Sequence, residues 1–229
     1  MQKKYRHELK YLVDERDLFL LDNKLIGIMK TDSHYQDGVY EIRSAYFDDY
    51  KDTALSQNLM GVSPRFKYRI RIYNSDNSFI HLEKKIKNHD MTHKESCSLS
   101  FEECKQLLNG NYTISPSDED FLKQFKAYAT IHRLIPKVVV IYERKAFICS
   151  DGNVRVTFDR NISSSTNIEN FFDINILKRP IMASGKHVLE VKYDEFLPKY
   201  IKKSLNTGKL DRTTFSKYYL CRKYTTGII

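Results

Sequence analysis

The sequence lacks tryptophan and has few residues that interrupt regular structure, with 8 glycines and 5 prolines among 229 residues. That scarcity excludes a collagen-like chain and a chain built mainly of flexible linkers. No stretch approaches the ~20 consecutive apolar residues that a membrane-spanning helix needs. The first residues are basic but no apolar stretch follows them, so they do not resemble a secretory signal.

Cysteine is also scarce, and the four cysteines are scattered as Cys97, Cys104, Cys149 and Cys221. No C-x-x-C pair is present, which argues against a redox motif or a zinc site of that type. We expect four reduced thiols in a cytoplasmic protein.

Apolar residues are plentiful, because 41% of the chain is hydrophobic and 13% is aromatic, enough to fill a core. There is no internal repeat and no linker, and the polar stretches 109–118 and 163–170 do not separate halves of different composition. We therefore predict one domain over residues 1–229. The net charge of +9 and the pI near 9.2 indicate an anionic partner: nucleic acid, an anionic membrane surface or a phosphorylated small molecule.

Helices are predicted where a capping residue is followed three positions later by an acidic residue. The pairs are Asp14/Asp17 before a helix to about Met29, Ser100/Glu103 before a helix to Gly110, and Ser117/Asp120 before a longer helix. Residues 198–206 and 214–224 have weaker helical patterns. Most of the remainder is rich in Val, Ile, Tyr and Phe with period-two alternation, which predicts strands.

Charged residues alternate with apolar residues in several of these predicted strands. In 66–72, one face carries Phe66, Tyr68, Ile70 and Ile72, and the other carries Lys67, Arg69 and Arg71. Successive side chains of a strand point to opposite faces, so each charged set lies on one face. The same alternation groups Arg6, Glu8 and Lys10; His81, Glu83, Lys85 and Lys87; Arg155, Thr157 and Asp159; and Glu190 and Lys192.

Two arrangements fit this pattern. In an ordinary antiparallel sheet the charged face lies in water. Three separate Glu-x-Lys units are hard to place on unrelated solvent faces, and they favour a closed barrel with the charges inside. Buried cations repel one another unless an anion lies among them, and glutamates can pair lysines or hold a divalent cation. We therefore predict an α+β fold, a closed antiparallel β-barrel with helices packed on its outside, enclosing a tunnel for a chain of phosphates.

An ordered set of short motifs resembles the vacuolar transporter chaperone (VTC) catalytic domain, a polyphosphate polymerase domain of the triphosphate tunnel metalloenzymes. The motifs are RHELKY (6–11), YFD (46–48), RIRIY (69–73), LEKK (82–85), YERKAF (142–147), RVTFD (155–159), LEVKY (189–193) and FSKY (215–218). A single E-x-K is weak evidence, but this ordered set is specific and runs from about residue 5 to residue 222.

The resemblance implies a set of site residues. Phosphate-binding roles fall to Lys10, Arg69, Arg71, Lys85, Lys94, Arg144, Arg155, Lys192 and Lys217. Lys67 lies on the cationic face of its strand and is also expected to bind phosphate. The expected catalytic residues are Arg69, Arg71, Arg144, Arg155, Lys192 and Glu190. Glu190 matches the family's metal-binding glutamate, and Glu83 is a second candidate ligand for Mn²⁺ or Mg²⁺.

The implied activity is metal-dependent transfer of the terminal phosphate of ATP onto a growing inorganic polyphosphate chain. Arg6 stands where hydrolases and cyclases of the superfamily carry the first Glu of Glu-x-Glu-x-Lys, which favours the polymerase. Two alternatives stay open: a tripolyphosphate or nucleoside-triphosphate hydrolase of the same fold, and a non-catalytic module that binds polyphosphate or nucleic acid. ATP and polyphosphate are the expected partners and nucleic acid is not, because the Lys84–Lys87 run lies within a regular strand alternation. A membrane-protein partner on a separate chain remains open.

Overall fold

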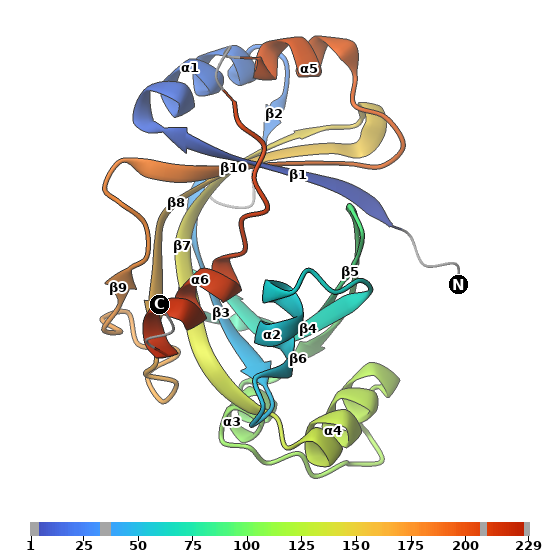
Figure 1. Cartoon of the computed structure of the whole chain (residues 1–229). Coiled ribbons are helices and arrows are strands. Elements are labelled where there is room, and N and C mark those ends of the chain that lie inside the picture. The colour runs from blue at the N-terminus through green and yellow to red at the C-terminus, as the bar shows by residue number, and fades with distance from the viewer. Residues whose placement is uncertain (1–4, 33–37, 207–209, 227–229) are drawn as a thin grey trace.

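Ten strands form one sheet in the residues described, 5–32, 38–206 and 210–226 of a computed structural model. Eight of them close into a barrel in the order β7-β3-β4-β5-β6-β1-β10-β8, with β8 pairing back to β7 (Figure 1). Their bounds are β1 (Arg6–Asp14), β3 (Val39–Asp48), β4 (Arg65–Tyr73), β5 (Asp76–Asn88), β6 (Met91–Leu99), β7 (Ile135–Cys149), β8 (Val154–Ser165) and β10 (Lys186–Tyr193). The short strands β2 (Lys30–Thr31) and β9 (Arg179–Pro180) extend the sheet beyond β7 and β8. The predicted closed antiparallel barrel is confirmed.

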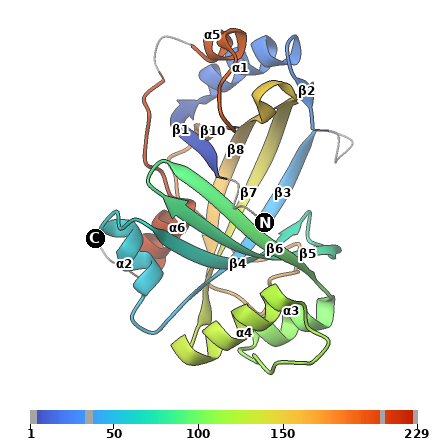
Figure 2. The ribbon, with the colours of Figure 1, turned by 90° about the vertical axis from the view of Figure 1, so that its right-hand side faces the viewer.

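The outward faces of the strands are apolar, and helices cover them. Helices α1 (Glu15–Ile26) and α5 (Lys199–Leu205) pack over β1, β8 and β10, where Leu21 and Ile201 meet Leu189. Helices α3 (Phe101–Leu108) and α4 (Asp120–His132) pack over β4 and β5, where Phe125 meets Ile70. Figures 1 and 2 show these two pairs at opposite ends of the molecule. Because apolar residues leave water on this side, the charged residues of the same strands face the interior.

A third apolar cluster forms around inner-face residues of β3 and β7. Helices α2 (Thr53–Leu59) and α6 (Lys217–Thr226) supply Leu55 and Tyr218 to it, against Tyr46 and Val140. Figure 1 shows both helices over one opening of the barrel. This packing leaves only part of the interior to the charged side chains.

Local signals set several of the helix boundaries. The capping boxes of α1 and α3 are confirmed, with Asp14/Asp17 and Ser100/Glu103 hydrogen-bonded reciprocally. The predicted box at Ser117 is wrong, because α4 begins at Asp120 after Glu119, which makes no side-chain cap. The neighbouring Asp118 instead accepts from the Ser115 backbone N–H and binds Lys126 Nζ at 2.7 Å.

The two C-terminal helices and α2 show which helices the sequence pattern can predict. Helix α5 falls within the predicted 198–206, and α6 begins at Lys217, later than the predicted residue 214. The sequence pattern predicts no helix at α2, whose first N–H groups are capped from a distance by Asp48, at 2.9 Å from Ala54 N and 3.0 Å from Leu55 N. No helix in the described ranges is long and apolar enough to cross a membrane.

Candidate active site

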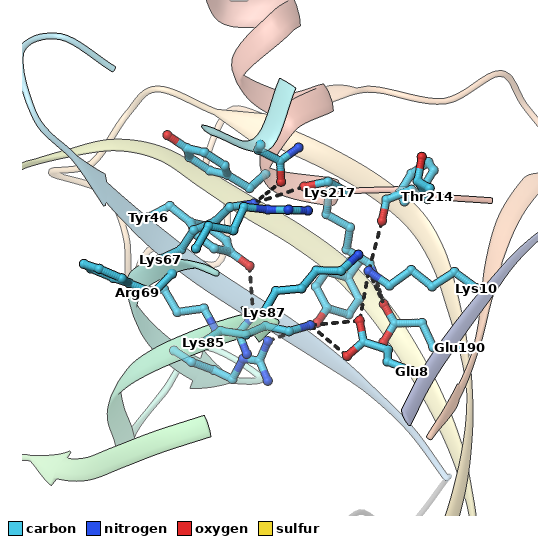
Figure 3. A pocket seen from close by; sticks show the side chains of 18 of the residues that line it. Glu8, Lys10, Tyr46, Lys67, Arg69, Lys85, Lys87, Glu190, Thr214 and Lys217 are labelled. Atoms are coloured by element: carbon cyan, nitrogen blue, oxygen red, sulfur yellow. Dashed lines mark hydrogen bonds and ion pairs between the residues drawn. The ribbon is translucent and has the colours of Figure 1, made fainter. Parts of the chain in front are cut away.

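The barrel encloses a cavity of about 120 Å³ whose walls are mostly charged (Figure 3). Strands β1, β3, β4, β5, β7 and β10 supply its side chains, together with α2 and the start of α6. The basic residues that line it are Lys10, Arg65, Lys67, Arg69, Arg71, Lys85, Lys87, Arg144, Lys192 and Lys217, and the acidic residues are Glu8 and Glu190. The structure therefore brings together eight of the ten predicted phosphate-binding residues, and Arg155 and Lys94 lie outside the lining.

Two of the Glu-x-Lys units face each other across β1 and β10. The antiparallel register places Lys10 opposite Glu190 and Glu8 opposite Lys192. Lys10 Nζ lies 3.1 Å from Glu8 Oε1 and 3.7 Å from Glu190 Oε1. The repeated motif thus places positive and negative charges alternately on the two strands. Burial lowers the pKa of Lys10, but Glu8 and Glu190 raise it more, so Lys10 stays protonated.

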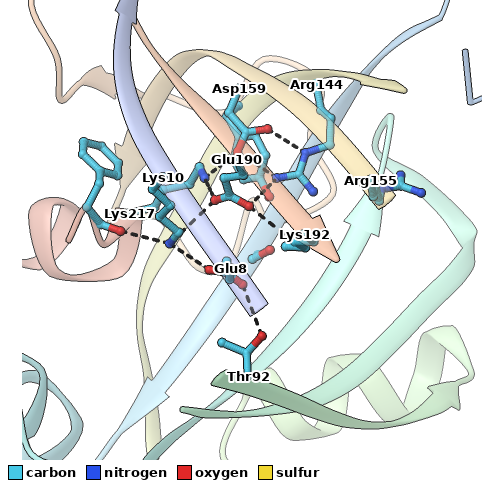
Figure 4. Close-up of polar contacts among 12 residues, drawn as sticks. Glu8, Lys10, Thr92, Arg144, Arg155, Asp159, Glu190, Lys192 and Lys217 are labelled. Carbon is cyan, nitrogen blue, oxygen red and sulfur yellow. Dashed lines mark hydrogen bonds and ion pairs between the residues drawn. The ribbon is translucent and has the colours of Figure 1, made fainter. Parts of the chain in front are cut away.

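Glu190 is the most heavily paired carboxylate of the cavity wall (Figure 4). Its oxygens lie 2.7 Å from Lys217 Nζ, 3.4 Å from Lys192 Nζ and 3.5 Å from Arg144 Nη2. Burial raises the pKa of Glu190, but Lys217, Lys10 and the other cations hold it well below its ordinary value. The side chain is therefore ionised, with its charge shared among four cations.

Asp159 fixes two of those cations from behind. It is fully buried, and it accepts hydrogen bonds from Arg144 Nε at 2.6 Å and Arg144 Nη2 at 2.7 Å. Lys217 Nζ lies 2.5 Å from Asp159 Oδ2, the oxygen that also accepts from Arg144 Nη2. The sequence placed Asp159 on the charged face without giving it a role. The structure makes it the residue that orients Arg144 and Lys217 toward Glu190.

Arg69 is fixed in the same way by Glu83. Glu83 Oε2 lies 2.7 Å from Arg69 Nε and 2.6 Å from its Nη2, and Oε1 accepts from Lys94 at 3.0 Å. Both oxygens are occupied, the residue is 1% exposed, and it is not part of the cavity lining. This geometry makes Glu83 a residue that orients Arg69, and its metal-ligand role stays a prediction.

Arg71 has weaker partners than Arg69 or Arg144. Its Nε donates to Ser44 Oγ and its Nη2 to Tyr142 Oη, both at 3.3 Å, and Nη1 is 3.9 Å from Glu83. A guanidinium has five N–H donors, so Arg71 retains hydrogen-bonding capacity toward the cavity. Tyr142 and Tyr46, which accepts from Arg69 at 2.8 Å, were missed from the sequence. The period-two alternation of their strands could have placed both phenols on the inner face.

The remaining two predicted residues bind carboxylates away from the cavity. Arg155 lies opposite Lys192 in the β8–β10 register, and its Nη2 donates to Asp32 at 2.6 Å and to Tyr40 Oη at 3.0 Å. The side chain of Lys94 is 54% exposed and contacts Glu83. Their roles in phosphate binding stay predictions.

The family model of the VTC domain matches residues 5–226. The chain belongs to the VTC domain family. No curated protein matches its sequence.

Solved structures confirm the tunnel fold of this VTC domain. A candidate adenylyl cyclase from Hippeastrum, described as having a dominant triphosphatase activity, is 13% identical with a TM-score of 0.53, over 96% of each chain. A candidate adenylate cyclase from Bacillus halodurans is 15% identical with a TM-score of 0.50, over 89% of this chain and 87% of that one. At such identities the likeness concerns the fold alone. It supports the tunnel fold that the resemblance predicts.

The resemblance implies a metal ion, and among the residues described the cavity wall supplies few ligands for one. Within the described ranges, no three His, Cys, Asp or Glu residues are grouped so that they could hold a metal by themselves. Only Glu8 and Glu190 bring carboxylates to the cavity wall. Mg²⁺ is commonly held by one or two carboxylates together with substrate phosphates. The donor set therefore fits a metal that binds together with phosphates, and the metal-ligand role of Glu190 stays a prediction.

Proposed function

We propose that this VTC domain is a polyphosphate polymerase that transfers the terminal phosphate of ATP to inorganic polyphosphate. The observation that supports this most is the convergence of eight predicted phosphate-binding cations with Glu190 on one cavity. These cations are Lys10, Lys67, Arg69, Arg71, Lys85, Arg144, Lys192 and Lys217. Phosphoryl transfer needs no protein nucleophile, because positioning and neutralisation of charge supply most of the rate.

Each group of side chains has a distinct task in this proposal. Arg69, Arg71 and Arg144 clamp phosphate oxygens, since a guanidinium can make paired hydrogen bonds to them. Lys10, Lys85 and Lys192 neutralise the neighbouring phosphates of the chain. An oxygen of the chain's terminal phosphate attacks the γ-phosphorus of ATP, the bond from that phosphorus to the bridging oxygen of the β-phosphate breaks, and ADP leaves. Glu190 would hold Mn²⁺ or Mg²⁺, which when bound neutralises charge on the phosphate oxygens. A cytoplasmic location and a membrane-protein partner on another chain stay predictions.

A triphosphate hydrolase is the second candidate, supported by the triphosphatase activity described for the Hippeastrum relative. The surroundings of Arg6 argue for the polymerase. This residue replaces the first Glu of the hydrolase motif, and its Nε lies 2.8 Å from Asp194 Oδ1, outside the cavity lining. The wall consequently has no third carboxylate at this position.

Incubation with ATP and Mn²⁺, followed by gel separation of the products, tests the proposal. Long phosphate chains that disappear when EDTA is added support the polymerase. Orthophosphate released from tripolyphosphate without chain growth supports the hydrolase. Unchanged ATP and unchanged tripolyphosphate would leave a binding module and overturn both enzymatic assignments.

Tripolyphosphate is expected to raise the melting temperature even without metal, because the cavity cations lose mutual repulsion when an anion binds. A ligand at 100 times its Kd stabilises by about 2.7 kcal/mol. At about 2–4 °C per kcal/mol for a chain of this size, the shift is about 5–10 °C. Differential scanning fluorimetry measures it, with sulfate at equal ionic strength as the control. An equal shift in both salts would contradict a site for linked phosphates.

Phosphate binding is expected to weaken as pH rises through about 8. Burial lowers the pKa of Lys192 to about 8, although Glu190 and Glu8 oppose the shift. Below that pH the ammonium is charged and attracts phosphate; above it the neutral amine does not. Titrations of the protein with metal-free tripolyphosphate between pH 7 and pH 9, which brackets that pKa, measure the loss of affinity. Lys192→Arg should retain affinity to higher pH, since arginine stays protonated, and an identical pH profile in both proteins would assign the loss to another group.

A further inference from the structure

Three cations at one end of the cavity have no carboxylate partner among the residues described. They are Arg65, Lys67 and Lys87, which line the cavity where β4 begins and β5 ends, and we call them the mouth. Lys67 Nζ contacts neutral groups: Asn58 Oδ1 at 2.5 Å and Ser216 Oγ at 3.3 Å (Figure 3), and the Tyr218 ring, whose centroid lies 4.8 Å away. Arg65 Nη1 donates to the Val62 carbonyl at 2.6 Å.

The strand register makes the mouth electrostatically unfavourable. Arg65 lies directly opposite Lys87, and Lys67 directly opposite Lys85. Like charges opposite each other in an antiparallel pair destabilise a sheet. Two residues beyond Lys67 in β4, Arg69 lies opposite Glu83, so its positive charge is paired with a negative one.

The interior differs from the mouth in this respect. There, Lys85 lies 2.8 Å from Glu8, and Lys217 lies 2.7 Å from Glu190. At the mouth, burial lowers the pKa of Lys67 well below its ordinary value, and Lys85, Lys10 and the other nearby cations lower it further. Burial and the neighbouring cations therefore disfavour the charged form of Lys67, and the register adds repulsion between Arg65 and Lys87; a bound anion would remove both penalties.

We propose that Arg65, Lys67 and Lys87 form a second anion subsite, which holds phosphates of a polyphosphate chain beyond those bound in the interior. The inference deepens the proposed function and rests on it. A mouth without carboxylates suits metal-free phosphates, whereas the interior with Glu8 and Glu190 suits the phosphates that carry a metal. A chain that spans both regions gains contacts with length, so affinity rises from tripolyphosphate to long chains.

The double variant R65A/K87A tests the subsite, with K202A/K203A on the exposed face of α5 as a control that removes the same charge. Kd values for tripolyphosphate and for long-chain polyphosphate are measured in EDTA, so that turnover does not interfere. The wild type and the control should bind the long chain more tightly. R65A/K87A should keep its affinity for tripolyphosphate and lose about tenfold or more for the long chain, as expected for lost charge-assisted hydrogen bonds.

The salt dependence and the stability of the same variants give independent readouts. By analogy with single-stranded nucleic acids, two lost phosphate contacts lower the slope of log K against log salt by about 1.4. The ligand-free R65A/K87A protein should melt at or above the wild-type temperature, because a repulsive pair is gone. K87E, which places a carboxylate opposite Arg65, should also fold stably and should bind the long chain weakly.

Equal losses for both ligands in R65A/K87A would make the mouth part of the triphosphate site and overturn the inference. A lower melting temperature in ligand-free R65A/K87A and K87E would assign these cations a structural role and overturn it too. Tighter binding of a single-stranded oligonucleotide than of long-chain polyphosphate would identify a different polyanion. If the wild type binds neither tripolyphosphate nor long-chain polyphosphate, the proposed function is wrong. If it binds both with equal affinity, only the proposed subsite at the mouth is wrong.

Discussion

Glu190→Gln is expected to abolish metal-dependent turnover and to leave metal-free polyphosphate binding intact. Glutamine preserves the size of the side chain but removes the charge that a hard divalent cation requires. The neighbouring cations Lys217 and Lys192, at 2.7 and 3.4 Å, lose a shared carboxylate, so the cavity becomes more positive and still attracts phosphate. The two effects are separated by measuring turnover with Mn²⁺ and Kd in EDTA.

Glu8→Gln is the matched control, because Glu8 is the other carboxylate of the cavity wall. Glu8 binds Lys85 at 2.8 Å and Lys10 at 3.1 Å, which is the contact pattern of a residue that orients lysines. Its loss should lower turnover without removing the dependence on metal concentration. Full activity in Glu190→Gln would exclude Glu190 as the metal ligand.

Stability should change less in Glu190→Gln than in a typical broken buried ion pair, which costs about 3–5 kcal/mol. The reason is that Lys217 keeps Asp159 at 2.5 Å and Lys10 keeps Glu8 at 3.1 Å. A melting temperature close to that of the wild type therefore accompanies the expected loss of turnover. Unfolding of the variant would instead assign Glu190 a structural role.

The barrel could be predicted from the sequence because the residues of each strand show which face is apolar and which face is charged. In β4 the apolar Ile70 packs outside and the charged Arg69 and Arg71 line the cavity, as the period-two alternation predicts. The ordered motifs also predicted the family that the match over residues 5–226 shows. The alternation and the motifs are both local features of the sequence, so they can be recognised without knowing which strands pair.

What depends on pairing could not be predicted in the same way. The resemblance made Glu83 a second candidate metal ligand, and only the β4–β5 register shows that it lies opposite Arg69. A short helix such as α2 was missed because its capping carboxylate, Asp48, belongs to the end of β3 and lies outside the usual capping position. Asp159 was on the correct face, but only the β7–β8 register shows that it lies opposite Arg144.

Arg71→Ala is expected to have the second large effect, a fall of about 10²–10³ in kcat/KM, judged from the loss of a single preorganised donor to a developing anion. Folding should be little affected, because the partners of Arg71 are the hydroxyls of Ser44 and Tyr142 at 3.3 Å, with Glu83 as far as 3.9 Å. Glu83 also keeps Arg69 and Lys94 after the substitution. Kinetics and thermal unfolding of the same variant measure the two quantities.

Arg144→Ala provides the contrast, since it removes a guanidinium that makes two hydrogen bonds to the fully buried Asp159. That variant should lose about 3–5 kcal/mol of folding free energy as well as activity, because only Lys217 then compensates Asp159. Arg71→Lys should restore part of the activity lost in Arg71→Ala, since it keeps the charge without the paired donors. If Arg71→Ala destabilised the fold as much as Arg144→Ala, Arg71 would be a structural residue. Because its hydrogen-bond partners are neutral hydroxyls at 3.3 Å and Glu83 lies 3.9 Å away, we expect its remaining donors to bind phosphate instead.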